Sequence, residues 1–280
     1  MTVADAETRV LVDLDWLDRQ TTPLLLIDAR PADAYARGHL PGAINLDTFF
    51  YVNEHTNPAG LRTIETDWAR MLGAAGIAPD DTAVFYDEGM QNYAPRGAFM
   101  LRYLGHDASH VLHSGIAGWI AAGRAVTTAD RTRQPTPDAT YPINPRREMI
   151  ATADDVVAAL DDPNVIVLDV RASDEYLGKM AMQGNPRLGR LPGVAYVEWT
   201  SLLNNKERYK GPAEMRRILA AAGVVPEKEI IVYCQRSHRA TNTYTALQSL
   251  GFPHVRVYPG SFYEWSRRED LPVEQPSEDR

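Results

Sequence analysis

The sequence predicts an α/β protein of two tandem domains, each a parallel sheet with helices on both faces. One observation behind this prediction is that both halves of the chain repeat a series of motifs in the same order. Another is that short runs of Val, Ile and Leu alternate with amphipathic segments, a pattern typical of parallel sheets covered on both sides. The length of 280 residues also fits two domains of about 150 residues each.

The repeated series starts with an apolar run that ends in Asp-x-Arg and continues to Gly-[His/Arg]-Leu-Pro-Gly. A second apolar run leads into a helix that ends in Leu-Gly, and a third leads into a Gly-containing turn and a Trp-bearing segment. The matching segments are 24–46 with 165–197, 82–105 with 229–251, and 110–119 with 255–265. We therefore predict an N-terminal domain at 1–126, a Pro-rich, charged linker at 127–148 and a C-terminal domain at 149–280.

Composition and charge exclude several classes of protein. The formal net charge of -8 disfavours nucleic acid as a partner, and no apolar run approaches the ~20 residues of a membrane span. The N-terminal segment has early acidic residues and no continuous apolar core, so we expect no signal peptide and a cytoplasmic protein. The single cysteine excludes an internal disulfide and multi-cysteine zinc sites, and the histidine spacing predicts no metal site.

The residue after the second apolar run distinguishes the two halves. It is Cys234 in the C-terminal half and Asp87 in the N-terminal half, and ligands of doubly wound sheets bind beyond such strand ends. A helix then opens through a loop of polar and basic residues: Gln235, Arg236, Ser237, His238 and Arg239. Backbone N–H groups, the helix dipole and the cationic side chains all favour a Cys234 thiolate and a bound small anion. We therefore predict a reactive Cys234 and an N-terminal domain that is inert in cysteine chemistry.

In its ordered combination this pattern resembles the tandem-domain rhodaneses, the thiosulfate and 3-mercaptopyruvate sulfurtransferases. The motifs that carry the resemblance, ending in Tyr-Cys-loop-helix and Gly-Ser-x-x-x-Trp, cover about residues 8–275. The loop Cys-Gln-Arg-Ser-His-Arg is most similar to the bacterial Cys-Gln-x-x-His-Arg type. The resemblance implies two rhodanese-like domains, the second catalytic, and a ping-pong transfer through a Cys234 persulfide. It implies no other cofactor, thiosulfate as donor, and cyanide or a thiol as acceptor.

Several residues around Cys234 have expected roles in this transfer. Loop N–H groups from Gln235 to Arg239 are expected to stabilise the thiolate, the persulfide and the departing anion. The Arg236 and Arg239 side chains are the candidates for binding the donor. Arg239 is also expected to pair with Asp169, which supports the loop together with Arg171. His238 acts as a general acid or, as we favour, only adds positive potential.

The C-terminal copy carries ten extra residues between its Asp-x-Arg and Gly-Arg-Leu-Pro-Gly motifs, within 178–189. In two-domain relatives a basic residue from this stretch helps to bind the anionic donor, so the resemblance implies that role for Arg187 first and Lys179 second. A solvated surface loop is the alternative. Glu175 stands where many relatives have Arg, so any donor contact of that Arg is absent or moved in this chain.

Other functions stay open at the level of the sequence. The 3-mercaptopyruvate sulfurtransferases resemble Cys-Gly-[Ser/Thr]-Gly-Val-Thr in this loop, whereas the two arginines here favour the dianion thiosulfate. A non-enzymatic persulfide carrier or regulatory module would deliver sulfur to a partner thiol protein, such as thioredoxin. A Cys-x5-Arg phosphatase is disfavoured, because Ala240 stands where that loop needs its arginine.

Overall fold

The computed structural model describes residues 9–48, 54–129, 136, 139–182, 184–205 and 208–275. The chain forms two compact units. Unit 1 comprises Met1–Tyr51, Thr63–Arg146 and Asn204–Tyr209, and unit 2 comprises Val52–Arg62, Arg147–Leu203 and Lys210–Arg280. Each half of the chain therefore contributes a short segment to the unit formed mainly by the other half. Among the described residues, no helix is long and apolar enough to cross a membrane.

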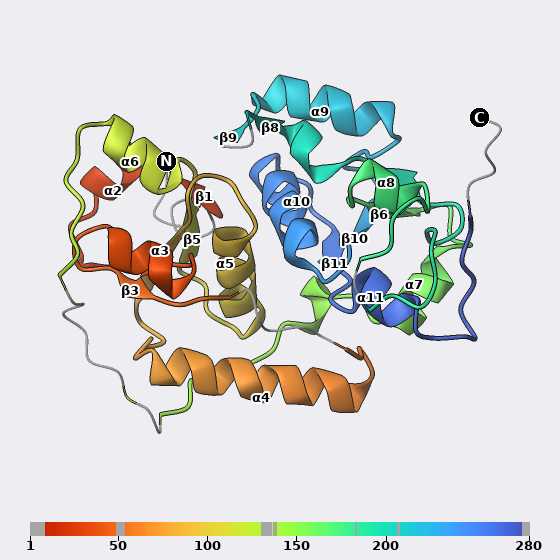
Figure 1. The fold of residues 1–280 in the computed structure, drawn as a ribbon, viewed down its shortest axis with the longest axis horizontal. Coiled ribbons are helices and arrows are strands. Elements are labelled where there is room, and N and C mark those ends of the chain that lie inside the picture. The colour runs from red at the N-terminus through yellow and green to blue at the C-terminus, as the bar shows by residue number, and fades with distance from the viewer. Residues whose placement is uncertain are drawn as a thin grey trace. The chain divides into compact units, whose positions relative to one another are not determined.

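Unit 1 is built around a five-stranded sheet in the order β1-β5-β4-β2-β3, in which all strand pairs are parallel. Its strands are β1 (Leu11–Val12), β2 (Leu24–Asp28), β3 (Ile44–Asn45), β4 (Thr82–Tyr86) and β5 (Ser109–Leu112). Its helices are α2 (Leu14–Asp18), α3 (Ala32–Arg37), α4 (Pro58–Ala74), α5 (Tyr93–Tyr103) and α6 (Gly115–Ala121), as Figure 1 shows. Helix α4 starts in the segment assigned to unit 2 and continues into unit 1. The central strand β4 is almost wholly buried, because it has a partner on each side and α5 packs on it.

Unit 2 repeats this plan with a four-stranded parallel sheet in the order β11-β10-β6-β7. Its sheet strands are β6 (Val165–Asp169), β7 (Ala195–Tyr196), β10 (Glu229–Tyr233) and β11 (Val255–Val257). A separate two-stranded ribbon consists of β8 (Leu203–Asn204) and β9 (Arg208–Tyr209). The helices are η1 (Arg147–Met149), α7 (Ala153–Ala159), α8 (Ser173–Tyr176), η2 (Trp199–Leu202), α9 (Pro212–Ala221), α10 (His238–Ser249) and α11 (Ser261–Trp265). The predicted α/β class with parallel sheets flanked by helices is confirmed.

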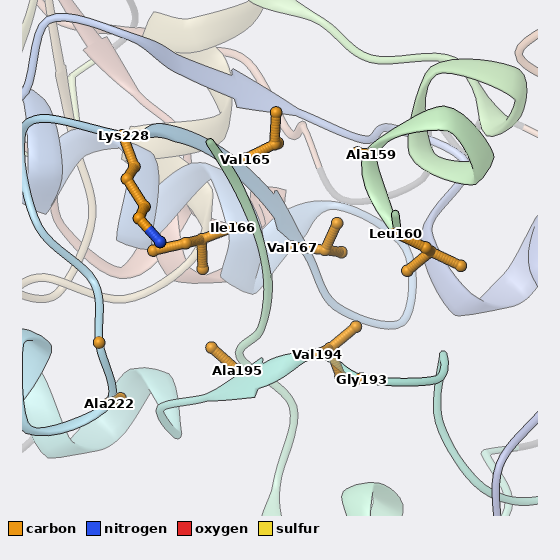
Figure 2. A pocket seen from close by; sticks show the side chains of 11 residues that line it. Ala159, Leu160, Val165, Ile166, Val167, Gly193, Val194, Ala195, Ala222 and Lys228 are labelled. Carbon is orange, nitrogen blue, oxygen red and sulfur yellow. The ribbon is translucent and has the colours of Figure 1, made fainter. Parts of the chain in front are cut away.

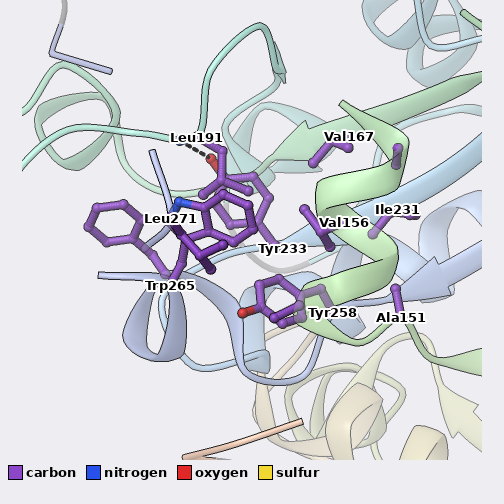
Figure 3. Packing of buried hydrophobic residues seen from close by; sticks show 12 residues of the cluster. Ala151, Val156, Val167, Leu191, Ile231, Tyr233, Tyr258, Trp265 and Leu271 are labelled. Carbon is purple, nitrogen blue, oxygen red and sulfur yellow. Dashed lines mark hydrogen bonds between the residues drawn. The ribbon is translucent and has the colours of Figure 1, made fainter. Parts of the chain in front are cut away.

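The core of unit 2 holds the elements that flank Cys234. Alternate strand residues point to opposite faces of a sheet, and Val167, Ile231 and Tyr233 share one face. They pack with Val156 of α7 and Trp265 of α11 (Figure 3). The residues between them in β10 are equally buried, and α10 packs against β10 and β11. This packing fixes β10, α10 and α11 relative to one another.

Buried hydrogen bonds hold the two exchanged segments. In unit 2, the backbone N–H and the hydroxyl of Thr56 each donate to the Glu264 carboxylate at 2.7 Å, and the hydroxyl accepts the Ala153 N–H at 2.8 Å. In unit 1, the Tyr209 N–H donates to Nε2 of His113 at 3.0 Å, and their rings stack with centroids 5.7 Å apart. The domain boundaries predicted from motif order do not include either exchange, because they assign each half of the chain to one domain.

The described part of the predicted linker runs along unit 1. The backbone of Thr127 pairs with that of His39, and the N–H of Tyr141 donates to the Ala69 carbonyl. Residues 130–135, 137 and 138 lie outside the described residues. The segment is therefore bonded to one unit on both sides of that gap.

Candidate active site

Cys234 follows the carboxyl end of β10, the position at which ligands bind in parallel α/β sheets. It is 1% exposed and is the only cysteine of the chain. Tyr233 lies opposite Asp169 in the register of β10 and β6, so Cys234 and the end of β6 share one edge of the sheet. A short loop separates Cys234 from His238, the first residue of α10. The cysteine therefore lies beside a helix N-terminus, whose partial positive charge favours an anion.

Helix α11 holds the cysteine loop by its carbonyl oxygens. The N–H of Phe262 donates to the Cys234 carbonyl and the N–H of Tyr263 donates to the Gln235 carbonyl, at 3.0 Å each. A trans peptide points its C=O and N–H groups to opposite sides, so the N–H groups of Gln235 and Arg236 point away from α11. The loop therefore presents these two backbone N–H groups on the side opposite α11.

The Ser261 side chain joins both ends of the loop. Its Oγ accepts the N–H groups of Cys234 at 3.3 Å and Ser237 at 3.2 Å, and its hydroxyl donates to the Tyr258 carbonyl at 2.8 Å. Ser261 is fully buried and has a φ of 53°, a left-handed conformation that disfavours residues other than glycine. Gly115 begins the corresponding helix of unit 1 with the same φ. The motifs did not indicate this role of Ser261, although the difference between the two copies is visible in the sequence.

The corresponding loop of unit 1 binds a carboxylate. Asp87, after the end of β4, is fully buried, and its own carboxylate accepts the N–H groups of Gly89, Gln91, Tyr93 and Ala94 at 3.1–3.4 Å. Burial outweighs these hydrogen bonds and raises the pKa of Asp87 to about 7. Helix α6 binds the first two loop carbonyls, as α11 does in unit 2. These backbone N–H groups thus converge on the side-chain oxygens of the residue at the strand end.

Asp169 is committed to neighbours at its own strand end. Its carboxylate accepts the backbone N–H and the guanidinium of Arg171 at 2.7–3.1 Å, and the Tyr233 hydroxyl at 2.6 Å. Arg171 also donates to the Gly189 carbonyl at 2.9 Å, and its Cζ lies 4.2 Å from the centroid of the Phe262 ring. Asp169 and Arg171 therefore brace α11, whose N–H groups hold the cysteine loop.

The predicted pairing of Arg239 with Asp169 is wrong, because Arg239 pairs with Glu175. Both outer nitrogens of the Arg239 guanidinium donate to the Glu175 carboxylate, with the two side chains 15% and 3% exposed. Burial opposes the charge of Arg239, but hydrogen bonding to Glu175 and the nearby Cys234 sulfur outweigh it and raise the pKa of Arg239. Glu175 therefore holds a loop arginine near the cysteine, a role that the sequence analysis missed.

Gln235 joins the loop to the inserted segment. Its side-chain amide exchanges two hydrogen bonds with that of Asn185, at 2.6 and 3.0 Å, and Gln235 is 3% exposed. The Gln235 side chain is therefore committed to the inserted segment, and its contact with a donor stays a prediction. Arg236 and His238 are half-buried, and Cζ of Arg236 lies 4.4 Å from the centroid of the Tyr263 ring.

Arg187 occupies a structural position. Its guanidinium donates hydrogen bonds of 2.6–2.9 Å to four backbone carbonyls in and after α11, those of Trp265, Ser266, Arg268 and Leu271. These bonds anchor the inserted segment and engage most of the five guanidinium N–H donors. Lys179 is exposed at the start of the insertion, and its side chain has no bonded partner among the residues that the structure describes. A donor contact of either side chain stays a prediction.

A cavity of about 350 Å³ lies at the opposite end of the unit 2 sheet (Figure 2). Val165, Ile166 and Val167 at the start of β6 line it, together with Lys228. Because parallel strands start at one edge and end at the other, this cavity is separate from Cys234. Within the described ranges, no three His, Cys, Asp or Glu residues form a group that could hold a metal ion.

Comparison with known proteins agrees with this geometry. The model of the rhodanese-like domain matches residues 13–122 and 152–268. Thiosulfate sulfurtransferase of Pseudomonas aeruginosa is 32% identical, with 90% of this chain and 91% of that protein covered. The sulfur carrier protein TtuD of Thermus thermophilus is 28% identical, with 98% and 99% covered. The solved structure of the anaerobic ergothioneine biosynthesis enzyme from Chlorobium limicola, in complex with trimethyl histidine, is similar with a TM-score of 0.83 at 25% identity, covering 99% of this chain and 72% of that chain.

These matches confirm the resemblance that the motifs indicated. Two copies of the domain cover most of the chain, the first containing Asp87 and the second containing Cys234. A relative above 30% identity spans nearly the whole chain. The chain belongs to the rhodanese family, with two rhodanese-like domains in tandem, and is a sulfurtransferase of the rhodanese type.

Proposed function

We propose that the protein transfers the outer sulfur atom of thiosulfate to cyanide or a thiol through a persulfide on Cys234. The observation that carries the proposal is the loop of unit 1, whose N–H groups converge on the carboxylate of Asp87. Cys234 stands at the corresponding place in unit 2, where the N-terminus of α10 and the N–H groups of Gln235 and Arg236 favour a thiolate or persulfide anion. The name of the relative from Pseudomonas aeruginosa supports thiosulfate as the donor.

The proposed first half-reaction exchanges one sulfur–sulfur bond for another. The Cys234 thiolate attacks the outer sulfur of thiosulfate and a new S–S bond forms. The old S–S bond breaks, and its electron pair leaves on sulfite. Cyanide or a thiolate then attacks the terminal sulfur, and Cys234 departs as the thiolate. Expelling sulfite needs no proton, so His238 only adds positive potential.

The charges around the loop favour a dianionic donor. Arg239 is held near Cys234 by Glu175, and Arg236 and His238 are half-buried on the same loop. Preorganised N–H groups and cations stabilise the negative charge that moves from the cysteine sulfur to sulfite. The donor 3-mercaptopyruvate, with a single carboxylate, would use fewer of these charges and is the alternative.

The mass of the intact protein tests the proposal. Thiosulfate is expected to add one sulfur atom to the wild type, and cyanide to remove it as thiocyanate. The Cys234→Ser variant should gain none, whereas Asp87→Asn should load normally, because unit 1 has no thiol. Sulfur gain by Cys234→Ser, or none by the wild type, would refute the proposal. Loading by 3-mercaptopyruvate alone would change the donor assignment.

Two relatives define other fates of the loaded sulfur. The name of TtuD supports a carrier that delivers persulfide sulfur to a partner protein. A carrier would keep its sulfur with cyanide or small thiols and release it to a protein thiol such as thioredoxin. The complex of the Chlorobium limicola enzyme supports including trimethyl histidine among the acceptors, with ergothioneine as the product to be sought.

A further inference from the structure

We propose that Arg267, together with Arg236 and Tyr263, forms a subsite for the carboxylate of an acceptor thiol. This inference rests on the proposed sulfur transfer through Cys234 and specifies its acceptor. The class of acceptor is a small thiol that carries a carboxylate separated from its sulfur by a carbon chain.

Two guanidinium groups lie over one aromatic ring next to the cysteine loop. Cζ of Arg267 is 3.4 Å, and Cζ of Arg236 4.4 Å, from the centroid of the Tyr263 ring. The ring is fixed at the loop, because the Tyr263 N–H donates to the Gln235 carbonyl at 3.0 Å. All three stacked residues are half-buried. Two positive charges therefore lie close together at the partly exposed rim of the loop that carries Cys234.

The charge of Arg267 is uncompensated. Its guanidinium donates to the Tyr263 carbonyl at 2.7 Å and to the Gly184 carbonyl, and no carboxylate pairs with it among the described residues. Its neighbour Arg268 instead forms ion pairs with Asp154 and Asp270. A guanidinium has five N–H donors, so Arg267 retains groups for a ligand. In a protein of net charge -8, such a group creates a local site for an anion.

The position of the stack favours an extended acceptor over the compact donor. The Arg236 side chain packs on Tyr263 of α11, whereas the backbone N–H groups of Gln235 and Arg236 point away from α11. In thiosulfate the charged oxygens are one atom from the outer sulfur, so they stay close to Cys234. In a mercaptocarboxylate the charge lies several bonds from the sulfur and can reach the stack. Cyanide has no second group, so its reaction should not depend on Arg267.

In the second half-reaction, one S–S bond forms and one breaks. The acceptor thiolate forms a bond to the terminal sulfur of the Cys234 persulfide, and the S–S bond to Cys234 breaks. Its electron pair stays on Cys234 as the thiolate, while the acceptor becomes a persulfide. The carboxylate takes no part in the bond changes, and its contact with Arg267 only binds and orients the acceptor.

The test mixes enzyme preloaded with thiosulfate with acceptors of different charge, compared at equal thiolate concentration. The acceptors are 3-mercaptopropionate, neutral 2-mercaptoethanol, cationic cysteamine and cyanide. Arg267→Gln is expected to slow 3-mercaptopropionate about tenfold, the factor of one charge-assisted hydrogen bond, and to leave 2-mercaptoethanol and cyanide within about twofold. Arg268→Gln is the matched control, because it removes an adjacent arginine whose charge is already paired.

The outcomes separate this inference from the proposed function. An equal loss with every acceptor, cyanide included, would show that Arg267 acts through the structure of the loop and would overturn the subsite. An unchanged rate with 3-mercaptopropionate would overturn it as well, while leaving the transfer to cyanide intact. Failure of the wild type to load sulfur would instead refute the proposed function. Added salt should weaken the preference for 3-mercaptopropionate in the wild type but not in Arg267→Gln.

Discussion

Two substitutions of Ser261 separate backbone strain from the hydrogen bonds that hold the cysteine loop. Ser261→Ala removes the Oγ that accepts the N–H groups of Cys234 and Ser237, but keeps a side chain at φ 53°. Ser261→Gly removes the same hydrogen bonds and also the strain, as Gly115 does in unit 1. Both variants therefore lose the hydrogen bonds of Oγ, but only Ser261→Gly also relieves the backbone strain.

The expected magnitudes follow from the two contributions. Ser261→Ala loses the two hydrogen bonds that Oγ accepts and the one that it donates to Tyr258, which at about 1 kcal/mol each lowers the free energy of unfolding by about 3 kcal/mol. Ser261→Gly should recover about 1 kcal/mol of this, since relief of about 1–2 kcal/mol of strain exceeds the entropic cost of glycine. The rate of persulfide formation depends on the lost hydrogen bonds alone and should fall about tenfold in both variants, equivalent to about 1.4 kcal/mol.

Urea unfolding measures the stability of both variants, and the mass of the intact protein over time measures sulfur loading. Ser249→Ala is the control, because the Ser249 hydroxyl donates to the Ala246 carbonyl at 2.7 Å at the far end of α10. Its loading rate should equal that of the wild type. Equal stability of the two Ser261 variants would refute the strain argument. A loading rate that follows stability, lower in Ser261→Ala than in Ser261→Gly, would refute the positioning role.

Three further substitutions test other parts of the structure. Glu175→Gln leaves Arg239 without a counter-charge and should lower the free energy of unfolding in urea by about 2 kcal/mol. The control Asp18→Asn breaks an exposed pair with Arg124 and should cost less than about 1 kcal/mol. The raised pKa of Asp87 predicts a stability contribution that is full below pH 3.8 and is lost as the pH rises to about 7; thermal melts of Asp87→Asn should lack this decline. Arg187→Lys loses most of four carbonyl contacts and should lower the melting temperature while changing the thiosulfate KM less than about twofold; a large rise in KM at unchanged stability would instead support the predicted donor contact.

The features that the sequence predicted correctly, the repeated α/β unit and the strand end before Cys234, are carried by local motifs that occur twice; the ion pair within Asp-x-Arg is a further local feature, which was not predicted. In Asp-x-Arg, the carboxylate and the guanidinium are only two residues apart, so they can meet in any fold that ends a strand there. Asp28 with Arg30 and Asp169 with Arg171 accordingly form the same ion pair at 2.7 Å in the two units. The place of Cys234 is equally local, because an apolar strand and the polar loop after it define a strand end.

The partner of Arg239 depends on contacts that motif order does not contain. Asp169 ends the neighbouring strand, but Arg171 and Tyr233 already occupy its oxygens, so Arg239 binds Glu175 in α8. Motif order likewise does not predict that Val52–Arg62 belongs to unit 2 and Asn204–Tyr209 to unit 1, because both assignments depend on tertiary contacts. The sequence nevertheless contained a signal for the pair of Arg239 with Glu175. The first copy has Ala34 at the position of Glu175, and its loop has no arginine from 88 to 94, so the acid and the arginine are absent together.

This comparison predicts that a thiol alone does not make unit 1 a sulfur-transfer site. In unit 1 the Asp87 carboxylate already accepts hydrogen bonds from the loop N–H groups, and Asp87→Cys would free these donors. The new thiol would still lack an arginine held by a buried carboxylate, because Ala34 cannot supply one. It would also lack the hydroxyl that joins both loop ends, because Gly115 has no side chain. In a Cys234→Ser background, Asp87→Cys should therefore gain no sulfur from thiosulfate by intact mass. Loading at the rate of the wild type would show that the backbone loop suffices and that Glu175 and Ser261 are dispensable.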